Sequence, residues 1–127
     1  MTEVIQRFGD NAHRLHLLAG LQKAIVALAA AGCTLLFLDG SFVTDKEFPD
    51  DYDICWNAAG VVAALLEPVF LDFDNLRAAQ KLKYGGEFFP VDWSAESTPP
   101  FRTFFEFFQV DQDTGVAKGI IAINLIP

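Results

Sequence analysis

The chain has 127 residues, a net charge of −8 and 52% hydrophobic residues, and these figures exclude several classes of protein. Chains of roughly 100–200 residues form one domain with a buried core, so we expect a single domain over residues 1–127. The 13 Phe residues argue against a disordered chain. A general binder of duplex DNA is also disfavoured, because such proteins neutralise phosphates with clustered Lys and Arg, and the sequence has no such cluster.

The cysteines and the apolar runs indicate in which cellular environment the protein is expected. Cys33 and Cys55 each lie in or next to an apolar run, and we expect both to be small buried hydrophobic residues. Residues 1–10 lack the basic-then-apolar order of a signal peptide. The longest low-charge stretch, residues 24–38, is about 15 residues long, which is shorter than the roughly 20 of a membrane helix. The sequence therefore predicts a soluble, cytoplasmic protein without membrane contact.

Hydrophobic patterning predicts the elements of the first half of the chain. Apolar residues recur at spacings of three and four between Asp10, the expected N-cap, and Gly32, the expected stop. The run after Gly32 is continuously apolar, which is typical of a strand buried on both faces. The Ala, Leu and Val residues before Pro68 carry no strong turn signal and indicate a helix. The predicted elements are a helix over residues 11–31, a strand over 33–38, a polar loop over 39–51, a strand over 52–56 and a helix over 58–67.

The second half alternates helices and strands in the same way. Asp72 or Asp74 is expected to cap a helix that ends at the Gly85-Gly86 break, and Thr98 is expected to cap the next helix, with prolines in its first turn. The remaining predicted elements are a strand over residues 87–93, a helix carrying the Phe residues at 101, 104, 105 and 108, a turn over 113–115 and a strand over 120–126. This order predicts an α/β (α+β) fold with a small mixed β-sheet flanked by helices.

The pattern that indicates chemistry runs from the end of the first predicted strand to the start of the second. Gly40-Ser41 follows the buried strand, and Asp51-x-Asp53 opens the next one. Alternate residues of a strand point to the same face, about 6.6 Å apart, so Asp51 and Asp53 project together. Two such carboxylates can ligate Mg²⁺, which often holds a substrate's phosphates. Without a Cβ at Gly40 a triphosphate can approach the backbone, where Ser41 adds a hydroxyl and an N–H.

Asp92 would complete this site with a third carboxylate. It lies between apolar neighbours on a predicted strand, where a lone buried Asp would be costly. If that strand lies beside the first two, Asp92 faces the same cluster, and a divalent cation relieves the repulsion among the three carboxylates. In two-metal chemistry one ion activates the attacking hydroxyl and the other steadies the leaving pyrophosphate.

On these residues the chain resembles the nucleotidyltransferase superfamily of the polymerase-beta-like fold. The signature of that superfamily is apolar-Gly-Ser, then Asp-apolar-Asp-apolar, with a later acidic residue on a strand. The residues in those places are Leu38, Gly40, Ser41, Asp51, Tyr52, Asp53, Ile54 and Asp92, with Asp39 intervening before the glycine. The surrounding sequence, from Asp39 to Asp53 and in the tail from Phe107 to Ile120, looks like that of a bacterial family of small, uncharacterised nucleotidyltransferase-like proteins.

The resemblance implies a minimal nucleotidyltransferase fold and the transfer of a nucleoside monophosphate from a nucleoside triphosphate to an unknown acceptor hydroxyl. Asp51 and Asp53 would hold Mg²⁺, or Mn²⁺ in its place, and Asp92 would be the third ligand or the base for the acceptor. Gly40 and Ser41 would hold the triphosphate. Lys46 is a further phosphate contact or, as an alternative, a solvated loop lysine.

Two alternatives stay open beside this interpretation. Few residues follow Trp93, so the chain is also expected, as an alternative, to be a catalytically degenerate nucleotidyltransferase fold that serves as a protein-interaction module, like an antitoxin in a toxin–antitoxin pair. The third possibility is a fold that shares the motif by chance, which a structure with Asp92 far from Asp51 and Asp53 would indicate.

Two further surfaces have a structural and a functional interpretation. The Phe stripe is expected to be core, with an interface to a homodimer or a protein partner as the alternative. Arg77, Lys81 and Lys83 form a basic edge on one helix. A solvated face is the default for such an edge, and a contact with an acceptor RNA or a nucleotide is the alternative.

Overall fold

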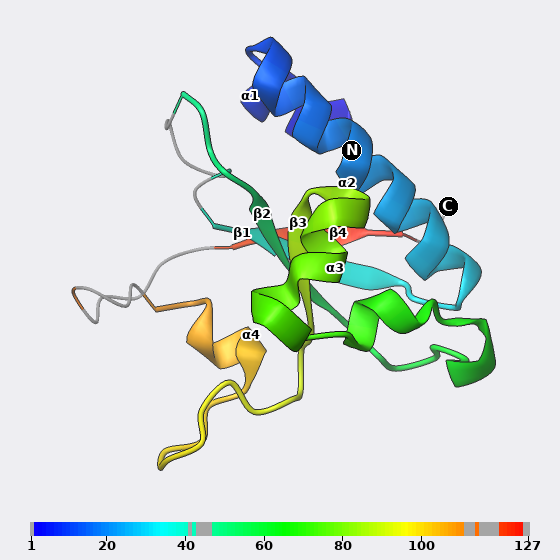
Figure 1. Cartoon of the computed structure of the whole chain (residues 1–127), viewed down its shortest axis with the longest axis vertical. Coiled ribbons are helices and arrows are strands. Elements are labelled where there is room, and N and C mark those ends of the chain that lie inside the picture. The colour runs from blue at the N-terminus through cyan, green and yellow to red at the C-terminus, as the bar shows by residue number, and fades with distance from the viewer. Residues whose placement is uncertain (1, 41, 43–46, 111–113, 115–119, 126–127) are drawn as a thin grey trace.

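The computed structural model describes residues 2–40, 42, 47–110, 114 and 120–125, and it has a mixed α+β fold (Figure 1), which confirms the predicted fold class. In chain order the elements are α1 (Thr2–Phe8), α2 (Ala12–Ala30), β1 (Leu35–Asp39), β2 (Tyr52–Trp56), the 3₁₀ helices η2 (Ala63–Leu65) and η3 (Pro68–Leu71), α3 (Asp74–Tyr84), β3 (Gly86–Pro90), α4 (Phe104–Phe107) and β4 (Ile121–Asn124). None of the helices in these ranges is long and apolar enough to cross a membrane.

The four strands form one mixed sheet in the order β3-β2-β1-β4. β1 is antiparallel to both of its neighbours, β2 and β4, whereas β2 and β3 are parallel. Parallel strands need a long crossover, and the segment from η2 to α3 supplies it between β2 and β3. This topology aligns the end of β1 with the starts of β2 and β3 at one edge of the sheet.

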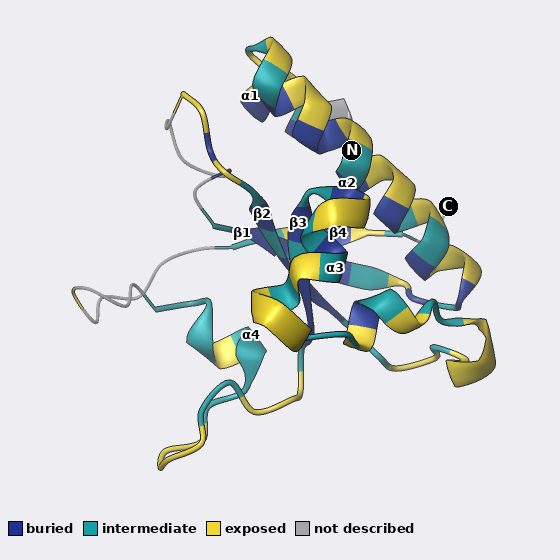
Figure 2. Cartoon of the chain, in the orientation of Figure 1, coloured by how far each residue is buried: buried dark blue, intermediate teal, exposed yellow. Residues whose placement is uncertain are grey.

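One face of the sheet is apolar and is covered by α2. Alternate strand residues such as Leu38, Ile54 and Phe88 are fully buried there in one cluster with Leu21 and Leu28 of the helix. Figure 2 shows the buried positions of α2 along the side turned toward the sheet. Because hydrophobic burial is the main stabilising term in folding, this face is the stable core of the molecule.

The cap of α2 differs from the prediction by one residue. The side chain of Asn11, not Asp10, accepts a hydrogen bond from the Arg14 N–H at 2.8 Å. The Asp10 carboxylate instead lies 3.5 Å from the buried Arg14 side chain as an ion pair. Asp and Asn are about equally favoured as N-cap residues, so residue type does not distinguish Asp10 from Asn11.

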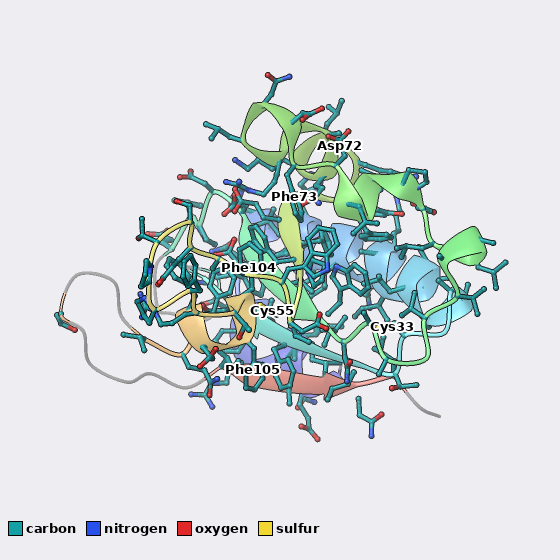
Figure 3. All side chains as sticks on the ribbon, turned by 90° about the horizontal axis from the view of Figure 1, so that it is seen from below. Cys33, Cys55, Asp72, Phe73, Phe104 and Phe105 are labelled. Atoms are coloured by element: carbon teal, nitrogen blue, oxygen red, sulfur yellow. The ribbon has the colours of Figure 1, made fainter. Side chains whose placement is uncertain are left out.

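The opposite face of the sheet is partly covered by α4. The ring of Phe37 on β1 packs 4.7 Å from Phe105, and the ring of Phe89 on β3 packs 4.4 Å from Phe104. In Figure 3, Phe104 and Phe105 lie on α4 beside Cys55 of the sheet. The expected core packing of the stripe therefore holds for its half-buried rings, but Phe101 is exposed.

The predicted start of the Phe-rich helix is wrong. Thr103, not Thr98, is the N-cap of α4, and it forms a capping box with Glu106. In a capping box two backbone N–H groups at the helix start are satisfied reciprocally by the N-cap side chain and by a Glu or Gln three residues later. Thr103 has Glu106 at that place, whereas Thr98 has Phe101. The short α4 therefore begins after the two prolines and leaves Phe101 outside the helix.

The segment between β2 and α3 is the largest error of the sequence prediction. In place of a helix over residues 58–67 the chain forms a turn and the single-turn η2. Gly60 has a φ of +83°, and the β-branched Val61 and Val62 follow it, so local preferences oppose an α-helix.

Helix α1 was not predicted. Cys33 and Cys55 are free thiols and buried, as expected.

Candidate functional site

Three carboxylates lie side by side across the sheet, one on each of β1, β2 and β3. In the strand register Asp39 pairs with Asp53, and Asp53 pairs with Glu87. Directly paired residues share a face, and neighbouring strands are about 4.7–4.9 Å apart. The face is the one opposite α2, because Ile54, the residue after Asp53, belongs to the α2 core. We call Asp39, Asp53 and Glu87 the acid row.

Asp51 extends the acid row by one carboxylate. It lies just before β2, two residues before Asp53, so the structure brings Asp51 and Asp53 together as the Asp-x-Asp spacing predicts. Burial, followed by the negative charges of the acid row and Asp51, raises the pKa of Asp53 to about 8. Burial also raises the pKa of Asp51, and the charge of Glu87 is the next cause. The site therefore holds negative charge that water solvates poorly.

The carboxyl groups of Asp53 and Glu87 lie close enough to interact directly, and this interaction is a further cause of the raised pKa of Asp53. Two carboxylates held together favour the protonated form of one of them. A divalent cation would relieve the same repulsion.

Gly40 lies directly against the acid row. Its φ of +93° is in the left-handed region, and a Cβ at this position would lie 2.8 Å from Oδ2 of Asp53. Only glycine combines this φ with so close an approach at no steric cost. The sequence interpretation assigned the open backbone of Gly40 to a triphosphate. In the structure the group that lies against it is the Asp53 carboxylate.

Two cations of α3 balance one member of the acid row. Nζ of Lys81 lies 2.9 Å from Glu87, and Nε of Arg77 lies 3.4 Å from the other oxygen of the same carboxylate. The guanidinium of Arg77 also lies over the ring of Phe89, 5.4 Å from its centroid. Glu87 is therefore held between its acidic neighbour on β2 and two basic side chains.

Asp92 does not lie on a strand, contrary to the prediction. β3 ends at Pro90, and the Trp93 N–H donates to the Pro90 carbonyl at 3.3 Å, which closes a turn around the exposed Asp92. Proline lacks an N–H for the ladder, which favours the end of the strand at this point. The acid row lies at the start of β3 and Asp92 beyond its end, several residues away at about 3.3 Å per residue.

The structure therefore places Glu87, not Asp92, beside Asp53. Because Asp92 lies away from Asp51 and Asp53, the structure meets the condition given above for a chance match of the Gly-Ser and Asp-x-Asp motif. However, Glu87 of the acid row supplies a different third carboxylate beside Asp53. Asp39 and Glu87 are the residues that sequence reasoning missed. One signal points to Glu87: it is the single charged residue of β3 and directly follows Gly85-Gly86.

Ser41 and Lys46, the other predicted nucleotide-binding residues, lie outside the residues that the structure describes. Within the described residues, no group of three or more His, Cys, Asp or Glu side chains has its ligand atoms arranged to hold a metal ion as they stand. The acid row has the all-oxygen donors that Mg²⁺ prefers. To converge on a cation, Glu87 would have to leave its present ion pairs with Arg77 and Lys81.

A groove of about 600 Å³ lies elsewhere, between α1 and β4. Its lining includes Arg7, Phe8 and Ile123, and no member of the acid row contributes to it. Its volume falls in the range of small-molecule sites, and its lining combines Glu3, Arg7 and Asn124 with apolar residues.

Comparison with known proteins gives a family and no activity. The Family of unknown function (DUF6932) matches residues 1–124. The chain belongs to this family. The DUF6932 match includes Gly40, Asp51 and the whole acid row, so the candidate site lies inside the matched region. No curated protein and no solved structure matches the chain.

Proposed function

We propose that the chain is a Mg²⁺-dependent nucleotidyltransferase-like protein, with Mn²⁺ as an alternative ion, that transfers a nucleoside monophosphate from a nucleoside triphosphate to an acceptor hydroxyl. The observation that carries the proposal is the acid row with Gly40 beside it: carboxylates from three adjacent strands lie in register, and the backbone of Gly40, which has no side chain, lies against that of Asp53. A backbone position without a side chain next to paired carboxylates suits a phosphate ligand together with its cation.

The electrostatics of the acid row support a cation there. Carboxylates withdrawn from water are tolerated when they are paired, protonated or bound to a metal, and the half-buried Asp53 lies among three other acidic groups. We assign Asp51 and Asp53 as the cation ligands and Glu87 as the third, in place of Asp92. When bound, Mg²⁺ would neutralise charge on the triphosphate and on the leaving pyrophosphate.

The reaction makes simple demands on the protein. A bond forms between the acceptor oxygen and the α-phosphorus, the bond from that phosphorus to the β-phosphate oxygen breaks, and pyrophosphate leaves with its electron pair. The hydroxyl proton needs an acceptor, and Asp39, the carboxylate outside the proposed ligand set, lies next to Asp53. A buried carboxylate at hydrogen-bond reach of the acceptor would serve as the general base.

The test is isothermal titration of ATP and GTP in the presence of Mg²⁺, on wild type and on Asp53→Ala. We expect binding to wild type and its loss in Asp53→Ala. Asp92→Ala is the matched control, because it removes an exposed carboxylate outside the acid row and should bind as wild type does. Absence of binding in wild type, or equal binding by Asp53→Ala, would contradict the proposal.

The interaction module remains the second candidate, and two observations favour it. The carboxylates are not arranged as a ready metal site in the part of the chain that is described. In addition, Trp93 and Phe101 are 45% and 53% exposed beside α4, and exposed aromatic residues are enriched at protein interfaces. Light scattering discriminates: this function requires a dimer or a defined complex that Trp93→Ser together with Phe101→Ser dissociates, while Asp53→Ala leaves it intact.

A further inference from the structure

Helix α3 supplies two cations to the acid row. Arg77, in the left-handed segment near the start of α3, and Lys81, in its regular part, both reach the carboxylate of Glu87. Their positive charges also act on Asp51, where they lower the pKa against the stronger effects that raise it. These two side chains therefore lie beside the proposed cation site.

The local structure holds Arg77 in this place. Its backbone has a φ of +63°, in the left-handed region, and Asn75 and Leu76 share this conformation. Left-handed backbone is strained for a residue with a Cβ, so packing must maintain it. The contact of the guanidinium with the ring of Phe89, which lies on the face of the acid row, is one such interaction.

Both cations can reach a ligand from solvent. The side chains of Arg77 and Lys81 are 26% and 39% exposed, whereas the Glu87 carboxylate between them is 15% exposed. Partly exposed ion pairs exchange partners at little cost, because water and other charges replace the lost contact. Arg and Lys are the two side chains that proteins use to bind phosphate.

We propose that Arg77 and Lys81 bind the polyphosphate of the nucleotide, and that they exchange Glu87 for phosphate oxygens once the acid row holds its cation. The inference rests on the proposed function and adds to it the groups that recognise the triphosphate. In the metal-free protein Glu87 keeps the two cations in place. With Glu87 engaged in the ligand set, the guanidinium and the ammonium face a substrate of opposite charge.

This exchange predicts effects of opposite sign on two ligands. Without Arg77 or Lys81 the acid row is more negative and Glu87 is released, so Mg²⁺ alone should bind about two- to fivefold more tightly, as expected for the loss of a partly exposed ion pair. The same substitutions remove a charged partner of the polyphosphate. ATP with saturating Mg²⁺ should bind about tenfold more weakly or worse.

Lys83 provides a matched control on the same helix. It is 52% exposed and pairs with Glu67 at 2.8 Å, away from the acid row. Lys83→Gln changes the net charge by the same amount as Lys81→Gln. It should leave both affinities unchanged.

The experiment is calorimetric titration of wild type, Arg77→Gln, Lys81→Gln, Lys83→Gln and Asp53→Ala with three probes: Mg²⁺ alone, Mg²⁺ with ATP, and Mg²⁺ with inorganic tripolyphosphate. We expect Arg77→Gln and Lys81→Gln to tighten Mg²⁺ and to weaken ATP and tripolyphosphate by the same factor. Thermal melting confirms that each variant is folded, and Lys81→Gln, whose side chain is the more exposed, keeps the test valid if Arg77→Gln does not fold.

The possible failures are distinguishable. If wild type binds Mg²⁺ with ATP through Asp53 but the two variants bind as Lys83→Gln does, the role of Arg77 and Lys81 is wrong and the proposed function stands. A loss for ATP without a loss for tripolyphosphate would also overturn it, because the contact would then be with the nucleoside. If wild type binds neither ligand, the proposed function fails and this inference with it.

Discussion

The two faces of the sheet are built from the same strands and differ most where the end of β1 meets the starts of β2 and β3. On the face covered by α2, Leu38, Ile54 and Phe88 are fully buried in a continuous apolar core. On the other face the residues one position away, Asp39, Asp53 and Glu87, place carboxylates in register. A shift of one residue along each strand separates the packing of the fold from its concentrated charge.

This difference assigns separate roles to the two faces. Hydrophobic burial against α2 stabilises the sheet, while the acid row opposes folding whenever its carboxylates are ionised without a cation. A face that lowers stability and contains a glycine fitted to a carboxylate is typical of a functional site. The comparison leads to four predictions on stability.

The largest expected effect comes from breaking the apolar face. Leu38→Ala removes a fully buried side chain from the core and should lower the free energy of unfolding by about 2–5 kcal/mol. Val26→Ala, at a position that is 69% exposed on α2, should change it by less than about 0.5 kcal/mol. Urea unfolding measures both, and equal losses would show that the α2 face is not the stabilising core.

Asp53→Asn should raise the free energy of unfolding, whereas Leu38→Ala lowers it. The folded-state pKa of Asp53 is raised to about 8, so folding favours the protonated carboxyl. The stabilising contribution of that proton is fully present below the unfolded pKa, near 3.8, and is lost as the pH rises through about 8. Without metal, wild type should therefore lose stability between about pH 4 and pH 8.

The variant tests this pH dependence directly. In EDTA at pH 8–9, Asp53→Asn should unfold with a free energy higher than that of wild type by about 1 kcal/mol or more, and its pH dependence should be shallower. Leu38→Ala should keep the wild-type slope. An Asp53→Asn variant that is less stable at every pH, with an unchanged slope, would show that this carboxylate is not strained.

Gly40→Ala should destabilise the protein and disturb the acid row. The left-handed φ costs about 1–2 kcal/mol for alanine, and the new Cβ would press on the Asp53 carboxylate. Gly60→Ala is the matched control: its φ is +83°, but the nearest atom to its Cβ is 3.5 Å away. Both variants should lose stability in thermal melts, and only Gly40→Ala should lose Mg²⁺ binding. Equal Mg²⁺ binding would remove Gly40 from the site.

The smallest effect is expected at α4, which covers part of the charged face. Thr103→Ala removes the side-chain half of the capping box and should cost about 0.5–2 kcal/mol of stability. Thr103→Ser keeps the hydroxyl and should restore most of it. If Thr103→Ala is neutral in thermal melting, α4 does not contribute to the stability of this face.

The sequence predicts the sheet better than its surroundings. β1 and β2 were found because a continuous apolar run and an alternating acidic-apolar segment are strong local signals, and Asp51 and Asp53 followed from the same alternation. The end of β3 could not be found in this way. Val91 and Trp93 continue its apolar character, so the strand was extended over Asp92, but the chain turns after Pro90.

The membership of the acid row depends on register, which is not a local property. Glu87 joins Asp53 because β2 and β3 are parallel and aligned, and Asp39 joins it because β1 is antiparallel. No spacing along the chain encodes these pairings, whereas the Asp-x-Asp spacing lies within one strand. The failure of the predicted helix over residues 58–67 has a local cause instead, because Gly60 and the β-branched Val61 and Val62 oppose an α-helix.

The most direct test of a cation and nucleotide site on the charged face is a crystal structure with Mg²⁺ and a non-hydrolysable ATP analogue. The account predicts a cation about 2.0–2.1 Å from carboxylate oxygens of Asp51 and Asp53, with the triphosphate beside Gly40 and Arg77. Asp92 should make no contact with either ligand. A nucleotide bound away from the acid row, for example in the groove between α1 and β4, or crystals without bound nucleotide, would contradict it.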